Sequence, residues 1–308
     1  MRAILLGPQR RPTLDGMMRS LGLPGPFVTV TAGWQEREPD DGELRQLLGG
    51  QAVNLELYRR WLDVQERDPE YALAERALQG VLGELADLYL LRLDYALQAV
   101  YALQRRTAGS ALAEAVAAVR SLDASHLAHV NEARGEFFGR LRPHDRPVIA
   151  VHRAEVAGFL DQAAAVVVAG GHVGVLTEVL HLFNVAAALQ STAGRSPVIA
   201  WSAGAMALAD RIVLFGDRSA HGPGHPEVYG SGLSVVRDVV LLPHAKARLL
   251  LDDVPRMAVF AQRFAPARCL PLEAGTRVEL SGDGSAGVPA GARVLGEDGH
   301  VTSSGEAP

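Results

Sequence analysis

The stretch Ser196-Pro-Val-Ile-Ala-Trp-Ser-Ala-Gly-Ala-Met206 decides the expected fold. Its apolar run is continuous, which is typical of a strand buried on both faces of a parallel sheet. The residues that follow Ser202 (Ala-Gly-Ala-Met-Ala-Leu-Ala) favour a helix. A strand, a tight turn and a helix form the setting of a nucleophile elbow. Small neighbours such as Ala200 and Gly204 leave room for that turn, and the helix N-terminus would point N–H groups at a developing oxyanion. The alternative is a structural turn in which Ser202 only caps the helix.

Further short apolar runs indicate the rest of the sheet. Most are rich in β-branched residues, and a helical stretch over 174–190 separates two of them. We expect an α/β fold with a mostly parallel sheet flanked by helices. Residues 276–301 predict a small antiparallel ending with turns at Gly282–Gly284 and Glu297–Gly299. The expected strands are 2–6, 27–31, 147–151, 164–169, 197–201, 211–215 and 238–242.

A long helical block interrupts this pattern. Apolar residues recur at helical spacing from Ala74 to Leu103, with Pro69 where a helix would begin and Gly109 where one would end. Shorter helices are expected near 54–66 and 110–122. We therefore predict an inserted helical subdomain over 43–142, an α/β domain made of 1–42 and 143–302, and a disordered tail over 303–308. The apolar stripe of the long helix needs a cover, so we expect it to form a homodimer contact or to roof the active site.

The composition excludes several classes of protein. The chain has 308 residues and a net charge of −5, with 35 acidic and 30 basic side chains, which argues against a nucleic-acid partner. Its one cysteine, Cys269, permits neither an internal disulfide nor a cysteine-based metal cage. No signal peptide core or unbroken membrane span is evident. We expect a cytoplasmic protein without membrane attachment, metal or cofactor.

A nucleophilic serine needs a base, and the base needs an orienting acid. His244 follows the expected strand 238–242, and Asp217 follows the expected strand 211–215. Ligands bind at the carboxyl ends of parallel strands, so Ser202, Asp217 and His244 could form a catalytic triad there. The alternatives are a structural histidine and an aspartate that only forms a turn.

The run Val168-Ala-Gly-Gly-His-Val-Gly174 adds a second element to this edge. Its paired glycines would let the backbone approach a substrate, and the N–H of Gly171 could stabilise an oxyanion. Together with Ser202 and His244, this run resembles the dipeptidase E and cyanophycinase family of serine peptidases. That resemblance implies a class I glutamine amidotransferase-like fold and a Ser202, His244 and Asp217 triad. It also implies oxyanion donors at Gly171 and Ala203, and hydrolysis of small peptides or isopeptides.

The chain departs from that family at three places. His172 stands where the family usually has Asn or Asp; by the resemblance this residue helps to shape the substrate pocket, so we expect His172 to bind substrate and the family's substrate preference not to transfer. Ala200 replaces the usual Gly two residues before the nucleophile, and the block 43–142 has no counterpart in short members.

Charged and aromatic residues near the expected site suggest how a peptide would be held. Lys246, the only lysine in the chain, and Arg248 follow His244 closely. Either could anchor a substrate carboxylate, although residues two apart do not share a helix face. Trp34 follows the second strand and either lines the pocket or fastens the first loop. His221 and His225 lack a third metal ligand in sequence, so we interpret them as parts of a turn.

Three other functions compete with a serine peptidase. An α/β-hydrolase esterase shares the order serine, acid, histidine, but its acid and histidine lie much further along the chain. A glutamine amidotransferase needs a nucleophilic cysteine, and Cys269 lies in no elbow. The third is a non-catalytic member of the same fold that binds a ligand or a partner.

Overall fold

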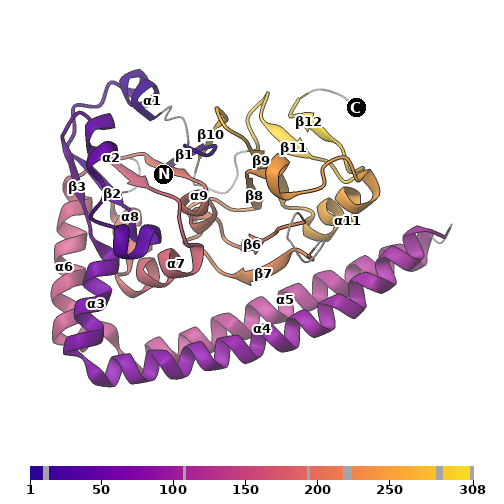
Figure 1. Cartoon of the computed structure of the whole chain (residues 1–308), viewed down its shortest axis with the longest axis horizontal. Helices are drawn as coiled ribbons and strands as arrows, with labels where there is room; N and C mark the ends of the chain where they lie inside the picture. Colours follow the sequence, from indigo (N-terminus) through magenta and orange to yellow (C-terminus); the bar gives the residue numbers. More distant parts are fainter. Residues whose placement is uncertain (10–13, 107–108, 193–194, 218–223, 282–286, 306–308) are drawn as a thin grey trace.

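A six-stranded sheet forms the centre of the computed structural model, which describes residues 1–9, 14–106, 109–192, 195–217, 224–281 and 287–305. The strand order is β10-β1-β5-β4-β2-β3, and all neighbours are parallel except β1 and β10. The fold is therefore α/β with a mainly parallel sheet (Figure 1). The strands are β1 (Arg2–Leu6), β2 (Phe27–Val30), β3 (Ala52–Asn54), β4 (Ala165–Val168), β5 (Val198–Trp201) and β10 (Arg277–Ser281).

Both faces of this sheet are buried, which explains its continuous apolar strands. On one face, Ile4 and Val167 pack in a core with Leu14 and Leu44. The helices of that face are α1 (Leu14–Leu21) and α2 (Gly42–Leu47). The opposite strand residues belong to a larger core with the remaining flanking helices. These are α3 (Leu57–Arg67), α6 (Pro147–Gln162), α7 (Val173–Leu182), α8 (Val185–Ser191) and α9 (Ala203–Leu208). Short 3-10 segments are η1 (Ala32–Arg37) and η2 (Pro143–Asp145).

Two of the expected strands, 211–215 and 238–242, correspond to β6 and β8, which lie outside the main sheet. The strand β8 pairs in parallel with β9 in a four-stranded sheet of order β12-β11-β9-β8, and β6 pairs with β7 in a separate antiparallel ribbon. The reason is that β10 already occupies the free edge of β1. These strands are β6 (Ile212–Leu214), β7 (Glu227–Gly230), β8 (Val239–Pro243), β9 (Arg268–Leu272), β11 (Arg293–Leu295) and β12 (Val301–Ser303). The helices α10 (Ala245–Arg248) and α11 (Val254–Phe264) accompany them.

The strand expected over 147–151 is wrong, because these residues form the first turns of α6. Pro147 occupies the first helical position, where its missing N–H costs nothing. The buried side chains of α6, Ile149, Val156 and Leu160, are spaced by seven and four, which is a helical stripe that continues beyond residue 151. A five-residue apolar run cannot by itself separate a strand from a buried helix turn.

The long helix expected over 74–103 is confirmed as α4 (Pro69–Gln104, 36 residues). Its partner α5 (Gly109–Leu141, 33 residues) is far longer than the helix expected over 110–122, and Gly109 begins this helix instead of ending the previous one. The two helices form a hairpin, about 54 Å long at 1.5 Å per residue, that runs along one side of the molecule (Figure 1). Leu73, Leu88, Leu91 and Tyr95 on α4 are each more than half exposed. The homodimer contact through these helices stays a prediction.

The boundaries of the predicted insertion differ from the structural elements. The range 43–142 contains β3, which pairs in parallel with β2 in the main sheet. The continuously helical part begins at α3. At the other end of the chain, Ser303 belongs to β12 and the N–H of Ser304 donates to the carbonyl of Ala292, so part of the predicted tail is ordered. Of the two predicted turns, Glu297–Gly299 joins β11 to β12, whereas Gly282–Gly284 lies outside the described residues.

No single helix in the described part of the chain is both long and apolar enough to cross a bilayer. Among the described helices, only α7 and α8 together reach that length and composition, and they are bent by 64° at their break. Leu180 of α7 and Val185 of α8 are fully buried in the core.

Candidate active site

Ser202 occupies a sharp turn between β5 and α9. Its backbone has φ 51° and ψ −124°, a conformation that L-residues rarely adopt and that costs about 1–3 kcal/mol. The first turn of α9 lies so close to β4 that a Cβ on Gly204 would stand 2.4 Å from the carbonyl oxygen of Val168. The expected strand–turn–helix arrangement is thus present, and its small residues are required by close backbone approach.

His244 lies directly opposite Ser202. It follows the last residue of β8, in a left-handed conformation (φ 58°, ψ 34°) that begins α10. Its Nε2 atom is 3.5 Å from the Oγ atom of Ser202, at the outer limit of a hydrogen bond. The N–H of His244 donates to the carbonyl of Leu272 on β9, which ties the histidine to the second sheet. The two predicted residues therefore meet where the two sheets approach each other.

Three glycines close the opposite wall of the site. A Cβ on Gly170 would stand 2.8 Å from the Cβ of Ser202, and a Cβ on Gly171 would stand 2.2 Å from the carbonyl oxygen of Gly33. Gly171 also has φ 126°, which other residues avoid. The N–H of His172 donates to that carbonyl of Gly33 at 2.7 Å and holds the loop. Ala203 is the first residue of α9, so its N–H has no acceptor within the helix.

Asp217 is fully buried, and its contacts run to the chain beyond His244. Its Oδ1 accepts from Arg256 at 2.6 Å, and its Oδ2 accepts from the N–H of Leu250 at 3.1 Å. Its own N–H donates to the carbonyl of Arg248, the last residue of α10. Asp217 therefore holds the backbone at 248–250, directly after the short helix that His244 begins. The prediction that it orients the imidazole directly stays a prediction.

A cleft of about 430 Å³ lies in front of Ser202 and His244. Trp34 and Arg248, two of the predicted substrate-binding residues, line it. Lys246 and His172 do not: Lys246 is exposed on α10, and His172 faces a neighbouring pocket. Pro8 and Gln9 also line the cleft; the signal that could have indicated them is their position directly after β1, at the same carboxyl edge of the sheet. The lining residues are Pro8, Gln9, Trp34, Gly170, Gly171, Val173, Trp201, Ser202, Ala203, Met206, Leu214, Pro243, His244 and Arg248.

Other predicted candidates lie away from this cleft. Cys269 is buried on β9, and burial raises the pKa of its thiol to about 12, so it is un-ionised at neutral pH. A thiol in that state is a poor nucleophile. His225 faces Asp94 on α4 at 3.3 Å, and burial lowers the pKa of its imidazole. His221 lies outside the described residues. Within the described ranges, no three His, Cys, Asp or Glu side chains gather as metal ligands would.

No protein-family model matches the chain, and no curated protein matches it. Solved structures do match, among them one described as "Crystal structure of a peptidase from an acI-B1 Actinobacterium". It is 14% identical, the alignment covers 99% of this chain and 95% of that chain, and the TM-score is 0.46. At that identity and TM-score, the likeness assigns neither a family nor an activity to this chain.

Proposed function

We propose that the protein is a serine hydrolase whose nucleophile is Ser202 and whose base is His244. The observation that carries this proposal is the pairing of a strained serine with a histidine 3.5 Å away, at the mouth of a cleft. A strained, non-glycine turn persists only where the surrounding structure enforces it, and such turns cluster at active sites. A serine that merely capped a helix would need neither the strain nor the facing imidazole.

The geometry supports an acyl-transfer mechanism. Nε2 of His244 takes the proton of Ser202 Oγ as the oxygen attacks a substrate carbonyl carbon, and it then gives that proton to the leaving amine. Water completes the cycle by attacking the acyl-enzyme with the same base. The N–H groups of Ala203 and Gly171, both on the cleft, are the proposed donors to the oxyanion. Asp217 positions His244 by holding the segment 248–250.

The proposed substrates are small peptides or isopeptides. The cleft is of the size that takes a small ligand, and Arg248 at its rim offers a bidentate partner for a substrate carboxylate. The motifs at 168–174, 196–206 and 243–244 resemble those of the dipeptidase E and cyanophycinase family, whose fold is class I glutamine amidotransferase-like. We propose membership of that fold class, with the α4–α5 hairpin as an addition.

The test is covalent labelling of Ser202 by a fluorescent alkylphosphonate, followed by a dipeptide library. We expect the wild type to be labelled, Ser202→Ala to be silent, and His244→Ala to be labelled far more slowly, because losing a triad member typically costs several powers of ten. Ser234→Ala is a matched control, since Ser234 also has a positive φ (53°) but lies outside the cleft. Absence of labelling in the folded wild type would favour the second candidate, a non-catalytic ligand-binding module of the same fold.

A further inference from the structure

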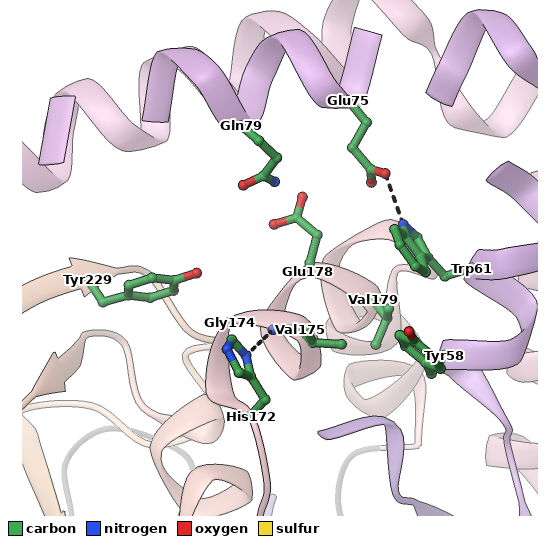
Figure 2. Close-up of a pocket in the computed structure, with 10 residues that line it drawn as sticks. All are labelled: Tyr58, Trp61, Glu75, Gln79, His172, Gly174, Val175, Glu178, Val179 and Tyr229. Carbon is green, nitrogen blue, oxygen red and sulfur yellow. Dashed lines mark hydrogen bonds between the residues drawn. The ribbon is translucent and has the colours of Figure 1, made fainter. Parts of the chain in front are cut away.

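A second pocket, of about 230 Å³, lies beside the Ser202 cleft, and the segment 171–173 runs between the two. Gly171 and Val173 line the cleft, whereas His172 between them lines the pocket. The helical hairpin supplies the other wall, so the pocket exists only because α4 lies over α3 and α7 (Figure 2). Its residues are Tyr58, Trp61, Glu75, Gln79, His172, Gly174, Val175, Glu178, Val179 and Tyr229.

Two carboxylates face this pocket from opposite helices. Glu75 extends from α4 and Glu178 from α7, and their side chains approach the same open space (Figure 2). Glu75 is 4% exposed, and the side chain of Glu178 is 12% exposed. Arg134 on α5 pairs with Glu178 at 3.0 Å, so one positive charge accompanies two acidic groups. The pocket therefore holds more acidic groups than basic partners.

The Glu75 carboxylate is held rigidly for binding. Its Oε2 accepts hydrogen bonds from Trp61 at 2.9 Å and from Gln65 at 2.6 Å, and its Oε1 accepts one from Tyr71 at 3.1 Å. A carboxylate offers about four lone-pair sites, so Oε1 retains capacity for a further donor. Burial raises the pKa of Glu75, and the charge of Glu178 adds to that rise. A cation between the two groups would offset both effects.

Aromatic rings complete the lining. Tyr58 and Trp61 are stacked with their centroids 5.5 Å apart, and Tyr229 stands on the other side of the pocket (Figure 2). The faces of such rings attract cations. An anion would be repelled by the carboxylates, and an apolar group would remove water from two acidic groups that share a single ion-pair partner, Arg134. The chemistry of the lining thus selects a positively charged organic group.

We propose that this pocket binds an organic cation, an alkylguanidinium or alkylammonium group, between Glu75 and Glu178 and beside the Trp61 and Tyr58 rings. Its volume is below the ~300–1,000 Å³ of pockets that take whole ligands, so it suits one side chain or a small amine. The imidazole of His172 is fixed as part of the wall, because its Nδ1 accepts from the N–H of Val175 at 3.2 Å. The binding does not depend on Ser202 being reactive.

Calorimetric titration tests this site directly. Butylguanidinium and butylammonium are titrated into the wild-type protein, with N-butylurea as the neutral isostere of the former. We expect saturable binding of the cations and none of the urea at the same concentrations. Glu178→Gln and Glu75→Gln should each raise the Kd for the cations about tenfold or more. Glu84→Gln removes an exposed carboxylate from α4 outside the pocket and should leave the Kd unchanged.

The source of the cation is distinguished in the Ser202→Ala protein, which cannot turn a substrate over. If a bound peptide supplies the cation, adding Glu178→Gln to the Ser202→Ala protein should weaken the binding of dipeptides with a basic residue more than the binding of neutral dipeptides. If a free amine is the ligand, Glu178→Gln should weaken the binding of butylguanidinium and butylammonium only. Either pattern supports the site. The proposal is overturned if neither cation binds saturably, if the urea binds equally well, or if Glu84→Gln weakens binding as much as Glu178→Gln. None of these outcomes bears on labelling of Ser202.

Discussion

Gly170 lies directly against Ser202: a Cβ on the glycine would stand 2.8 Å from the Cβ of the serine. The Oγ atom of Ser202 would be 3.5 Å from that same Cβ. Real Cβ atoms do not approach another carbon to 2.8 Å, so any side chain here must displace either the elbow or the loop after β4. The glycine thereby fixes how closely the proposed nucleophile can approach the backbone that would bind an oxyanion.

Replacing this glycine should therefore damage the site without unfolding the protein. We expect Gly170→Ala to lower the phosphonate labelling rate of Ser202 by about tenfold to 100-fold, because a displacement near 1 Å costs that much. Gly158→Ala is the matched control, since a Cβ there meets nothing within 4 Å and a helical alanine is favoured over glycine. Labelling of Gly170→Ala at the wild-type rate would show that the close contact does not position Ser202.

The contacts of Asp217 suggest that it acts on His244 through the backbone. If it positions the base by holding segment 248–250, its ion-pair partner Arg256 should matter nearly as much. We expect Asp217→Asn and Arg256→Met to lower the labelling rate of Ser202 by similar factors. The exposed Asp252→Asn should have no effect. A loss near 10⁴ for Asp217→Asn alone, as when an acid partner of a catalytic histidine is removed, would instead indicate direct contact with the imidazole.

Of the two predicted anchors, Arg248 lines the cleft, whereas Lys246, exposed on the short helix α10, does not. We expect Arg248→Ala to raise KM for peptides with a free carboxylate about tenfold, near 1.4 kcal/mol, and to leave a neutral ester almost unaffected. Lys246→Ala should change neither value. An equal loss on both substrates would mean that Arg248 supports the loop of His244 and not the substrate.

Four strands of the main sheet (β1, β2, β4 and β5) and the turn at Ser202 could be predicted, because they depend on local sequence. By contrast, β3 falls within the predicted helical insertion, and His244 follows a strand of the second sheet and not of the parallel sheet in which that strand is expected. Continuous apolar runs specify strands buried on two faces, and small residues around Ser202 specify a tight turn. The sheet to which β8 belongs could not be predicted, because it depends on β10 reaching the edge of β1 more than 270 residues along the chain. The length of α5 could not be predicted for another reason: the polar and small residues that follow Leu122 carry little periodic apolar signal, so nothing in the sequence extends the helix expected over 110–122 to Leu141.

The second pocket could not be found from the sequence, because it too depends on contacts between residues far apart in the chain. Glu75 and Glu178 are about a hundred residues apart, and each alone reads as an ordinary solvated charge. They meet only because the hairpin folds over α7. Asp217 and Arg256 likewise come together through the packing of α11, which no local pattern indicates.

A buried ion pair joins the hairpin to the rest of the molecule. Arg263 on α11 donates to both oxygens of Asp123 on α5 at 2.7 Å and to the hydroxyl of Tyr89 on α4 at 2.9 Å. Both charged side chains are at most 4% exposed. We expect Asp123→Asn or Arg263→Met alone to lower the free energy of unfolding by about 3–5 kcal/mol, because each leaves an uncompensated buried charge.

The double variant Asp123→Leu with Arg263→Met should recover much of that loss, since it leaves no buried charge unpaired. Urea unfolding measures all three proteins. The exposed pair Arg195–Asp161, whose side chains are 60% and 62% exposed, is the control, and Arg195→Met should cost less than about 1 kcal/mol. A small effect of Arg263→Met would show that the hairpin is held by its apolar contacts alone.

The buried carboxyl of Glu75 should give the protein a measurable pH dependence. Burial raises its pKa in the folded state above the ordinary value of 4.5, so between the unfolded and folded pKa values the folded protein binds more protons. The raised pKa therefore adds to the free energy of unfolding. This contribution is fully present below pH 4.5 and is lost as the pH rises through the folded pKa of Glu75. Glu75→Gln has no such proton, so the wild type should be favoured most at low pH and lose that advantage as the pH rises.

The measurement is the free energy of unfolding of the wild type minus that of Glu75→Gln, followed from pH 4 upward. Contributions from carboxyl groups that do not interact with Glu75 are common to both proteins and cancel in this difference. Glu84→Gln, on the exposed side of α4, should keep the wild-type slope. Butylguanidinium should also make the free energy of unfolding of the wild type depend less steeply on pH, because a cation beside Glu75 favours its ionised form and lowers its folded pKa. A difference that is constant with pH would mean that the pKa of Glu75 is the same in the folded and unfolded protein, and the charge that offsets its burial would then have to come from Arg134 or another neighbour within the fold.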